Sequence, residues 1–195
     1  MEDPSTPSIV LASTSPRRLR LLQDMGLTFR IQDSKVIENH VFSNPKQLVL
    51  ENANLKAKAV ALSHPDSLVI GADTTVFMEG RFFHKPTDLD EAYQMLVTLS
   101  GKTHEVHTGV SLHCRSMGWW QQFSDLNTVT LKTLSPKQIE AYIRLVNPLD
   151  KAGAYGIQHY RNKIIDSYSG SLSSIMGMPV TQLRVQLNRL GYGVN

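Results

Sequence analysis

The chain has 195 residues, 41% of them hydrophobic, with a formal net charge of +3 and a sequence pI near 9.0. This length suits one domain of ordinary size, or two lobes that share a cleft. The one cysteine, Cys114, excludes a disulfide within the chain and fits a reducing cytoplasm. The small, dispersed positive charge suits an anionic ligand but is too weakly clustered for a nucleic-acid-binding face.

The N-terminus and the hydropathy both argue against export and membrane insertion. Residues 1–7, M-E-D-P-S-T-P, carry acids and prolines where a secretory signal needs positive charge and then an apolar run. We expect these residues to form a flexible lead-in. No segment approaches the roughly 18 uninterrupted apolar residues of a membrane helix. The sequence therefore predicts a soluble, cytoplasmic protein with one domain over residues 1–195 and no membrane partner.

Strand-like and helix-like periods alternate along the chain, which is typical of an α/β protein. The first half predicts a strand at 9–12, helices at 16–25 and 45–62, and a buried strand at 68–71. Gly26 ends the first helix. Asp73 is expected just beyond the end of the second strand.

The second half continues the alternation. A hairpin is predicted at 76–83, with its turn at Glu79 and Gly80. Ser135 and Pro136 are expected to begin a helix. The segment D-K-A-G-A-Y-G-I-Q is too irregular for a helix and carries polar groups that point to a ligand. The other predicted elements are helices at 88–99, 136–146 and 181–190 and strands at 104–113 and 119–131.

The strongest local signal is L-A-S-T-S-P-R-R, where a strand leads into the start of a helix. Free backbone N–H groups and the helix dipole favour an anion at such a corner. Ser13 and Ser15 add short donors, and Arg17 and Arg18 can each bind two phosphate oxygens. The alternative is an N-capping serine followed by two solvated arginines.

The second signal is I-G-A-D-T-T, in which a carboxylate follows a strand end, the usual place of ligands in open α/β sheets. Beside a triphosphate, Asp73 would act through Mg²⁺ or through a water that it deprotonates, because bare like charges repel. The alternative is an aspartate that caps a turn. Lys56 and Lys85 are compact cations able to neutralise a phosphate, or else solvated surface charges.

Histidines and aromatic residues offer two weaker hypotheses. His104 and His107 are three residues apart, but on a strand their side chains would point to opposite faces, which argues against a shared metal. Trp119 and Trp120, beside Phe123, could stack on bases. Aromatic residues near a turn more often cover a sheet.

These signals occur in a known order, and the sequence resembles the Maf family of nucleoside triphosphate pyrophosphatases over nearly its whole length. Each stretch alone is a weak signal, but together they are specific. The family-like stretches are S-T-S-P-R-R, N-A-N-L-K-A-K-A-V, G-A-D-T-T, K-P-T-D, L-S-G-K-T-H-E-V-H-T-G-V, P-L-D-K-A-G-A-Y-G-I-Q and S-I-M-G-M-P-V, together with the lone Glu38.

The resemblance implies a Maf- and ITPase-like fold, a mixed twisted sheet flanked by helices in an elongated, two-lobed molecule with a central cleft. It implies hydrolysis of a nucleoside triphosphate between the α and β phosphates, with Mg²⁺ or Mn²⁺, in a house-cleaning role. It also implies a homodimer, which is a common but not universal state in the family.

The resemblance further assigns roles to single residues. Asp73 matches the catalytic carboxylate, and Glu38 matches a second acid near the metal. The positions that match residues around the substrate are Ser13, Ser15, Arg17, Arg18, Lys56, Thr74, Lys85 and Gln158.

Three of these positions differ between family subgroups, and Arg17, Thr74 and Gln158 resemble the subgroup that cleaves dTTP and UTP. An amide such as Gln158 can donate and accept at once, which suits the imide edge of thymine or uracil. Two departures bear on base selection: His84 replaces a glycine, and H-Y-R at 159–161 replaces a glycine-rich continuation.

Two other classes of function stay open on the sequence. One is a nucleotide-binding regulator of septum formation with little turnover, although such a protein would not need the metal-side acids. The other is a basic RNA-binding module, for which salt-sensitive binding without triphosphate turnover would be diagnostic.

Overall fold

The structure is a computed structural model that describes residues 6–194. These residues form two compact units. Unit 1 comprises residues 6–73, 108–125 and 177–194, and unit 2 comprises residues 74–107 and 126–176. Of the expected lead-in, residues 1–5 lie outside the described part. No helix between residues 6 and 194 combines the length and the apolar character needed to cross a membrane.

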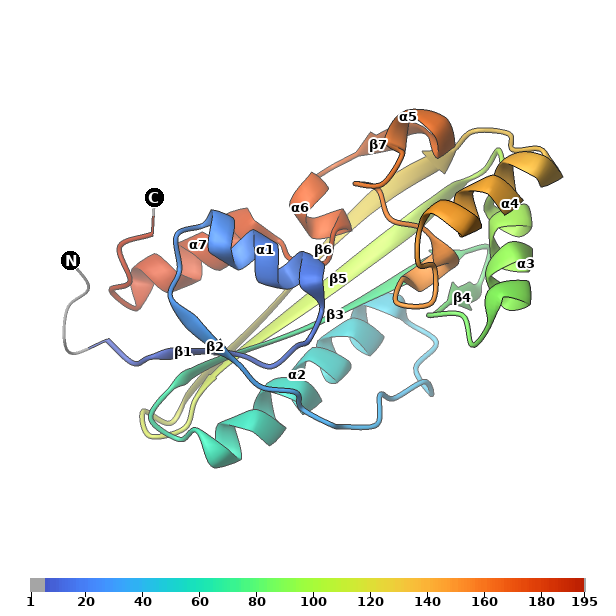
Figure 1. Ribbon diagram of the computed structural model, residues 1–195. Coiled ribbons are helices and arrows are strands. Elements are labelled where there is room, and N and C mark those ends of the chain that lie inside the picture. The colour runs from blue at the N-terminus through green and yellow to red at the C-terminus, as the bar shows by residue number, and fades with distance from the viewer. Residues whose placement is uncertain (1–5, 195) are drawn as a thin grey trace. The chain divides into compact units, whose positions relative to one another are not determined.

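Within the described residues the strands form a seven-stranded mixed sheet (Figure 1). The order is β2-β1-β3-β5-β6-β7, and β4 pairs with β3. Strand β1 is parallel to β2 and β3, whereas β3–β4 and β6–β7 are antiparallel. The expected α/β class with a mixed sheet and flanking helices is confirmed. The strands are β1 (Ile9–Leu11), β2 (Phe29–Ile31), β3 (Leu68–Met78), β4 (Arg81–Phe83), β5 (Thr103–Cys114), β6 (Trp119–Leu131) and β7 (Ile165–Ser169).

The five longer helices, α1, α2, α3, α4 and α7, agree closely with the predicted ones. Ser135 caps α4 in a capping box with Gln138, as expected from the Ser-Pro start. Asp88 caps α3 by accepting a hydrogen bond from the Glu91 amide. The helices are α1 (Pro16–Asp24), α2 (Pro45–Ser63), α3 (Leu89–Leu99), α4 (Pro136–Leu145), α5 (Arg161–Ile164), α6 (Leu172–Ile175) and α7 (Val180–Arg189), with a 3₁₀ turn η1 at Ala152–Ala154.

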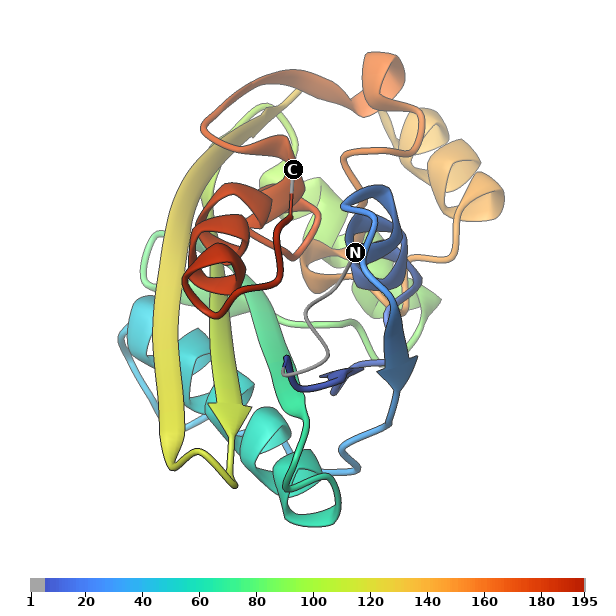
Figure 2. The same cartoon turned by 90° about the vertical axis from the view of Figure 1, so that its left-hand side faces the viewer.

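In unit 1, helices cover both faces of the strands. Successive strand side chains point to opposite faces. Ile9 and Leu11 therefore share one core with α1 and α7, whereas Val10 shares another with Ala57 and Val60 of α2. In Figures 1 and 2, α1 and α7 lie on one side of β1 and α2 lies on the other.

Helix α2 lies unusually close to the sheet because two glycines face it. A Cβ at Gly71 would overlap the Ala53 carbonyl and lie 2.7 Å from the Ala57 nitrogen. A Cβ at Gly109 would lie 2.6 Å from the Val49 carbonyl oxygen. Real side chains do not approach backbone so closely, so glycine at both places sets the depth at which α2 packs.

One predicted boundary was wrong. The strand expected to end at Gly71 runs on as β3 to Met78, so Asp73 lies inside a strand and not beyond its end. The β-branched residues Thr74, Thr75 and Val76 favour extended backbone. The β4 strand then pairs with Val76–Met78 across the turn at Glu79 and Gly80, both with positive φ, as the hairpin prediction required.

Short elements of unit 2 escaped the sequence analysis. Helices α5 and α6 have four residues each and β7 has five. Such lengths are too short for a helical or alternating period to register. The stretch 150–158 is irregular as expected, with a single 3₁₀ turn in which Gly153 has φ 68°.

A histidine–tyrosine pair is buried in unit 2. His104 of β5 and Tyr155 are joined by a hydrogen bond of 2.6 Å between Nε2 and the phenolic oxygen. Both residues are buried. Burial lowers the pKa of His104 to about 4 and raises the pKa of Tyr155 well above its ordinary value. At neutral pH the pair is therefore uncharged.

We expect His104 to make the protein less stable in mild acid. Its pKa is about 4 in the folded chain and 6.5 in the unfolded chain, so between these values the unfolded state binds more protons. The contribution of His104 to the free energy of unfolding is then fully present above pH 6.5. It decreases as the pH is lowered, by up to about 1.4 kcal/mol per pH unit, until the pKa of the folded state is reached. Urea denaturation at pH 7, 6 and 5 should show a shallower fall for His104→Gln. Parallel pH dependences of the two proteins would contradict the assignment.

Candidate functional site

The candidate site begins where β1 ends beside the parallel strand β3, which runs on past this level. Leu11 of β1 pairs with Ile70 of β3, and the Ala12 amide donates to the Ile70 carbonyl at 2.8 Å. The chain passes from β1 to β2 on one side and returns to β3 on the other, so the strand order reverses at β1. Ligands of open α/β sheets bind at the carboxyl ends of strands at such a reversal.

Residues Ser13–Arg18, which we call the serine–arginine corner, follow β1 at this edge. The Ser13 hydroxyl oxygen accepts from the Ser15 amide at 3.3 Å and from Arg18 Nη1 at 3.2 Å. Arg18 Nε donates to the Gly177 carbonyl at 3.0 Å. Ser15 occupies the N-cap position of α1, but its side chain makes no capping hydrogen bond. These contacts hold the Arg18 side chain in a fixed place in the first turn of α1.

Arg18 is within electrostatic reach of the acids. Burial lowers the pKa of its guanidinium, Asp73 and Glu38 raise it, and Arg17 lowers it. Arginine stays protonated in proteins all the same. The corner and the two carboxylates, separated in the sequence, therefore share one electrostatic environment in unit 1.

A buried ammonium lies between Glu38 and Asp73, which we call the acid pair. Lys56 Nζ is 2.7 Å from Asp73 Oδ1 and 2.8 Å from Glu38 Oε1. Its third contact is the Ala72 carbonyl oxygen at 3.4 Å. Lys56 is only 7% exposed, and Asp73 is 6% exposed. An ammonium has three hydrogens, so the protein itself accepts all three.

Asp73 receives a second hydrogen bond that the sequence analysis did not foresee. Asn52 Nδ2 donates to Asp73 Oδ2 at 3.2 Å. Both carboxylate oxygens are therefore held, one by Asn52 and the other by Lys56. These residues are four apart on α2 and so lie on one face. The spacing within N-A-N-L-K was the signal that could have identified Asn52.

The acid pair also fits a divalent cation. Mg²⁺ is usually held by one or two protein carboxylates together with substrate phosphates and waters. Each carboxylate oxygen can accept more than one bond, so Glu38 and Asp73 keep acceptor capacity beside Lys56. Residues 6–194 contain no cluster of three or more His, Cys, Asp or Glu side chains that would hold a metal by themselves.

The other predicted substrate residues lie in unit 2. Thr74 follows Asp73 on β3 and is half-buried, and Lys85 is exposed after β4. Gln158 is half-buried, and its Oε1 is buried with no hydrogen-bond partner. A buried acceptor of this kind is costly unless something donates to it.

The two departures in unit 2 are also placed. The His84 ring stacks on Phe82, with centroids 5.5 Å apart. Beyond Gln158, Tyr160 has φ 50°, and the Arg161 guanidinium lies 4.5 Å from the Tyr168 ring centroid.

The histidines and aromatic residues have separate surroundings. His104 bonds Tyr155, whereas His107 Nε2 is 2.7 Å from Glu105 and His113 Nε2 is 2.9 Å from Asn54 Oδ1. Trp119 and Phe123 pack against the core of unit 1. Trp120 is 58% exposed and stacks on His113.

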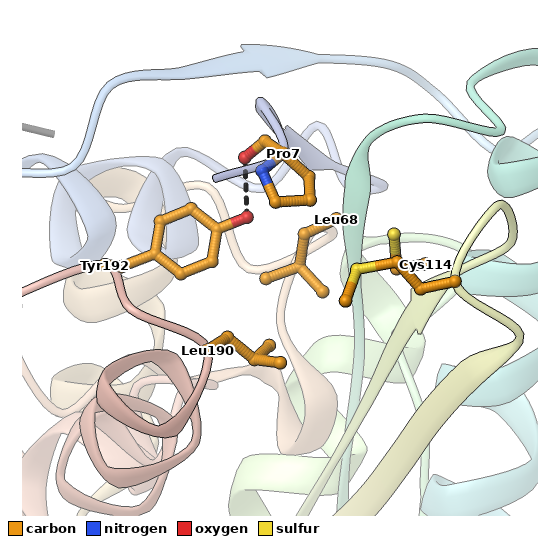
Figure 3. A pocket seen from close by; sticks show the side chains of 6 residues that line it. Pro7, Leu68, Cys114, Leu190 and Tyr192 are labelled. Atoms are coloured by element: carbon orange, nitrogen blue, oxygen red, sulfur yellow. Dashed lines mark hydrogen bonds between the residues drawn. The ribbon is translucent and has the colours of Figure 1, made fainter. Parts of the chain in front are cut away.

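A separate apolar pocket in unit 1 is unsuited to phosphate (Figure 3). The hydroxyl of Tyr192 already donates to the Pro7 carbonyl at 2.5 Å. No charged side chain and none of the candidate residues lines the pocket. The lining residues are Pro7, Leu68, Cys114, Met117, Leu190 and Tyr192.

Fold and site together define an α/β protein with a cationic corner after β1 and an acid pair formed by Asp73 of β3 and Glu38. The chain belongs to the Maf-like protein family, whose model matches residues 8–190. The family resemblance of the sequence is thereby confirmed.

Curated relatives cover nearly the whole chain. A dTTP/UTP pyrophosphatase of Akkermansia muciniphila is 43% identical over 95% of this chain and 98% of its own. A dTTP/UTP pyrophosphatase of Desulforamulus reducens is 43% identical over 94% of this chain and 96% of its own. A solved structure of a HAM1 protein from Coxiella burnetii is 16% identical over 94% of this chain and 99% of its own, with a TM-score of 0.49.

We expect Lys56→Met to destabilise the protein by about 3 kcal/mol, because it leaves the buried carboxylate of Asp73 and the half-buried carboxylate of Glu38 without their shared cation. Lys58→Met is the matched control, since Lys58 lies on the same helix and is exposed. It should change the free energy of unfolding by less than about 0.5 kcal/mol. Urea denaturation of the two variants checks this, and equal effects would show that the Lys56 ion pairs add no stability.

Proposed function

We propose that this protein is a hydrolase that cleaves dTTP and UTP to the nucleoside monophosphate and pyrophosphate. The observation that carries the proposal is the acid pair of unit 1 within electrostatic reach of Arg18. A triphosphate needs cations to hold it and a carboxylate to direct water at it. The names of the 43%-identical relatives support the same substrates.

In the proposed reaction Asp73 orients or deprotonates the attacking water. A new bond forms between the water oxygen and the α-phosphorus, and the α–β anhydride bond breaks. Its electron pair leaves with pyrophosphate. Glu38 and Asp73 would hold Mg²⁺ or Mn²⁺, which supplies charge neutralisation to the phosphate oxygens.

In this proposal, the hydroxyl and guanidinium groups of the serine–arginine corner bind the phosphates together with Lys85. Ser13 accepts bonds from Ser15 and Arg18, so its own hydrogen can be donated to a phosphate oxygen. Arg17, Arg18 and Lys85 neutralise charge, and Ser15 adds a donor at the start of α1. Lys56 reaches a phosphate only by exchanging one of its three protein acceptors, so its first role is to hold the acid pair.

Base selection is assigned to Gln158, with Arg17 and Thr74. The unpartnered Oε1 of Gln158 supports this role, because the N3–H of thymine or uracil would give it the donor that it lacks, while its amide hydrogens bond a base carbonyl. The homodimer, the cytoplasmic location and the absence of a stable nucleic-acid partner stay predictions of the sequence.

The proposal is tested with a panel of canonical and modified nucleoside triphosphates, with Mg²⁺ or Mn²⁺, in which both products are measured. Turnover of dTTP and UTP to equal amounts of monophosphate and pyrophosphate is expected. Release of orthophosphate with a diphosphate would mean a different bond is cut. Tight nucleotide binding without turnover would favour the regulatory alternative.

We expect Asp73→Asn to lose at least about 100-fold in turnover of dTTP, because the amide cannot take a proton from water. The fold should persist, since the variant keeps the size of the side chain. Asp66→Asn, at an exposed position of unit 1, is the control and should hydrolyse dTTP at the wild-type rate. A variant at position 73 that is folded and fully active would remove Asp73 from the mechanism.

We expect Gln158→Ala to reduce kcat/KM for UTP more than for purine nucleoside triphosphates, narrowing the preference by about 10-fold or more. Arg17→Ala should likewise alter the base preference more than it alters stability. Parallel kcat/KM measurements with UTP, dTTP, GTP and ATP distinguish the effects. An equal loss for all four nucleotides would place these side chains away from the base.

A further inference from the structure

The polar clamp made by Asn52 joins two parts of the candidate site. Its Oδ1 accepts from the Asn39 amide at 2.7 Å, and its Nδ2 donates to the Asn39 carbonyl at 3.1 Å and to Asp73 Oδ2 at 3.2 Å. Asn52 is buried, with only 2% of the residue exposed. Both amide hydrogens and the acceptor oxygen are therefore used, with the orientation of the amide fixed by the Asn39 N–H.

Asn52 hydrogen-bonds the backbone of the segment that contains Glu38. Residues 32–44 form no helix or strand. Ile37 is 93% exposed and Val41 is 84% exposed, so these two apolar side chains do not anchor the segment in a core. Polar contacts to α2 anchor it instead, since Lys56 holds the Glu38 carboxylate and Asn52 holds the backbone of the next residue, Asn39.

The same two helix residues also hold Asp73, one on each carboxylate oxygen. Lys56 supplies charge, which many arrangements of two acids could satisfy. Asn52 supplies direction, because a planar amide with both donors and its acceptor engaged tolerates little rotation. The spacing of Glu38 from Asp73 thus depends on Asn52 as much as on the cation between them.

We propose that Asn52 is a positioning residue, which fixes Asp73 and the Glu38 segment in one common geometry for the hydrolysis proposed above. It does not touch the nucleotide. Its effect on the reaction passes through the two acids, and misplacing a reacting group by about 1 Å can cost about 100-fold in rate. This inference rests on the proposed function, but the clamp itself can be tested without turnover.

The first readout is hydrogen exchange of the Asn39 amide, measured by NMR on the full chain. Asn52→Ala should remove the acceptor and raise the exchange rate of this amide by about 10-fold or more. Asn52→Asp keeps an acceptor oxygen and should retain most of the protection. Asn54→Ala is the matched control, because it removes the same amide from the same helix, where it bonds His113. It should leave Asn39 exchange unchanged.

The second readout divides kcat from KM for dTTP hydrolysis. Asn52→Ala should lower kcat by about 10- to 100-fold and change KM by less than about 3-fold. Asn52→Asp should lose at least as much kcat despite its protected Asn39 amide, because it removes the donor to Asp73 and puts a like charge there. Asn54→Ala should keep the wild-type kcat.

Three outcomes would overturn the inference. They are unchanged Asn39 exchange in Asn52→Ala, an unchanged kcat in that variant, and an Asn52→Asp enzyme with wild-type kcat, which would show that only the segment is held and not Asp73. Urea denaturation identifies a variant that has lost activity only because it is unfolded. If Asn52→Ala does not fold, Asn52→Asp tests the proposal in its place. If the wild-type protein hydrolyses no nucleoside triphosphate, the proposed function fails, while the exchange comparison still decides whether the clamp exists.

Discussion

The site depends on one ammonium group shared by two carboxylates. Glu38 and Asp73 each have a carboxylate oxygen within 2.8 Å of Lys56 Nζ. Two carboxylates that share one contact atom in this way would repel each other without the cation between them. Burying the three charges is costly, so the arrangement is stable only where the geometry is good and the remaining hydrogens are used. The Ala72 carbonyl accepts the third hydrogen.

The ammonium reaches the acids because α2 packs deeply on the sheet. Gly71 and Gly109 leave no side chain between the helix and the strands, so residues one turn apart on α2 can both contact Asp73. The apolar side chains of the helix face Val10 and Val69 on the same surface. Close packing and polar chemistry are therefore two results of the same approach, and a change in helix depth would alter the carboxylate geometry.

Much of the fold was predictable because its signals are local. A Glu-Gly turn between apolar runs specified the β3–β4 hairpin, and Ser135 with Pro136 specified the start of α4. The end of β3 was not predictable in the same way. Asp73 disfavours a strand locally, but pairing with β1 and β4 on either side of it keeps the backbone extended. Helices and strands of four or five residues gave no period to detect.

The sequence by itself determined the family, the α/β class and the candidate chemistry, because motifs such as S-T-S-P-R-R and G-A-D-T-T depend only on residue identity and order. Only the tertiary structure decided what those side chains contact. Lys56 and Asp73 are 17 positions apart and Asn52 and Asp73 are 21 apart, and no periodicity reports contacts at such separations. The structure alone revealed that Asn52 holds Asp73 and that the protein accepts all three hydrogens of the Lys56 ammonium. Both follow from how closely α2 packs on the sheet.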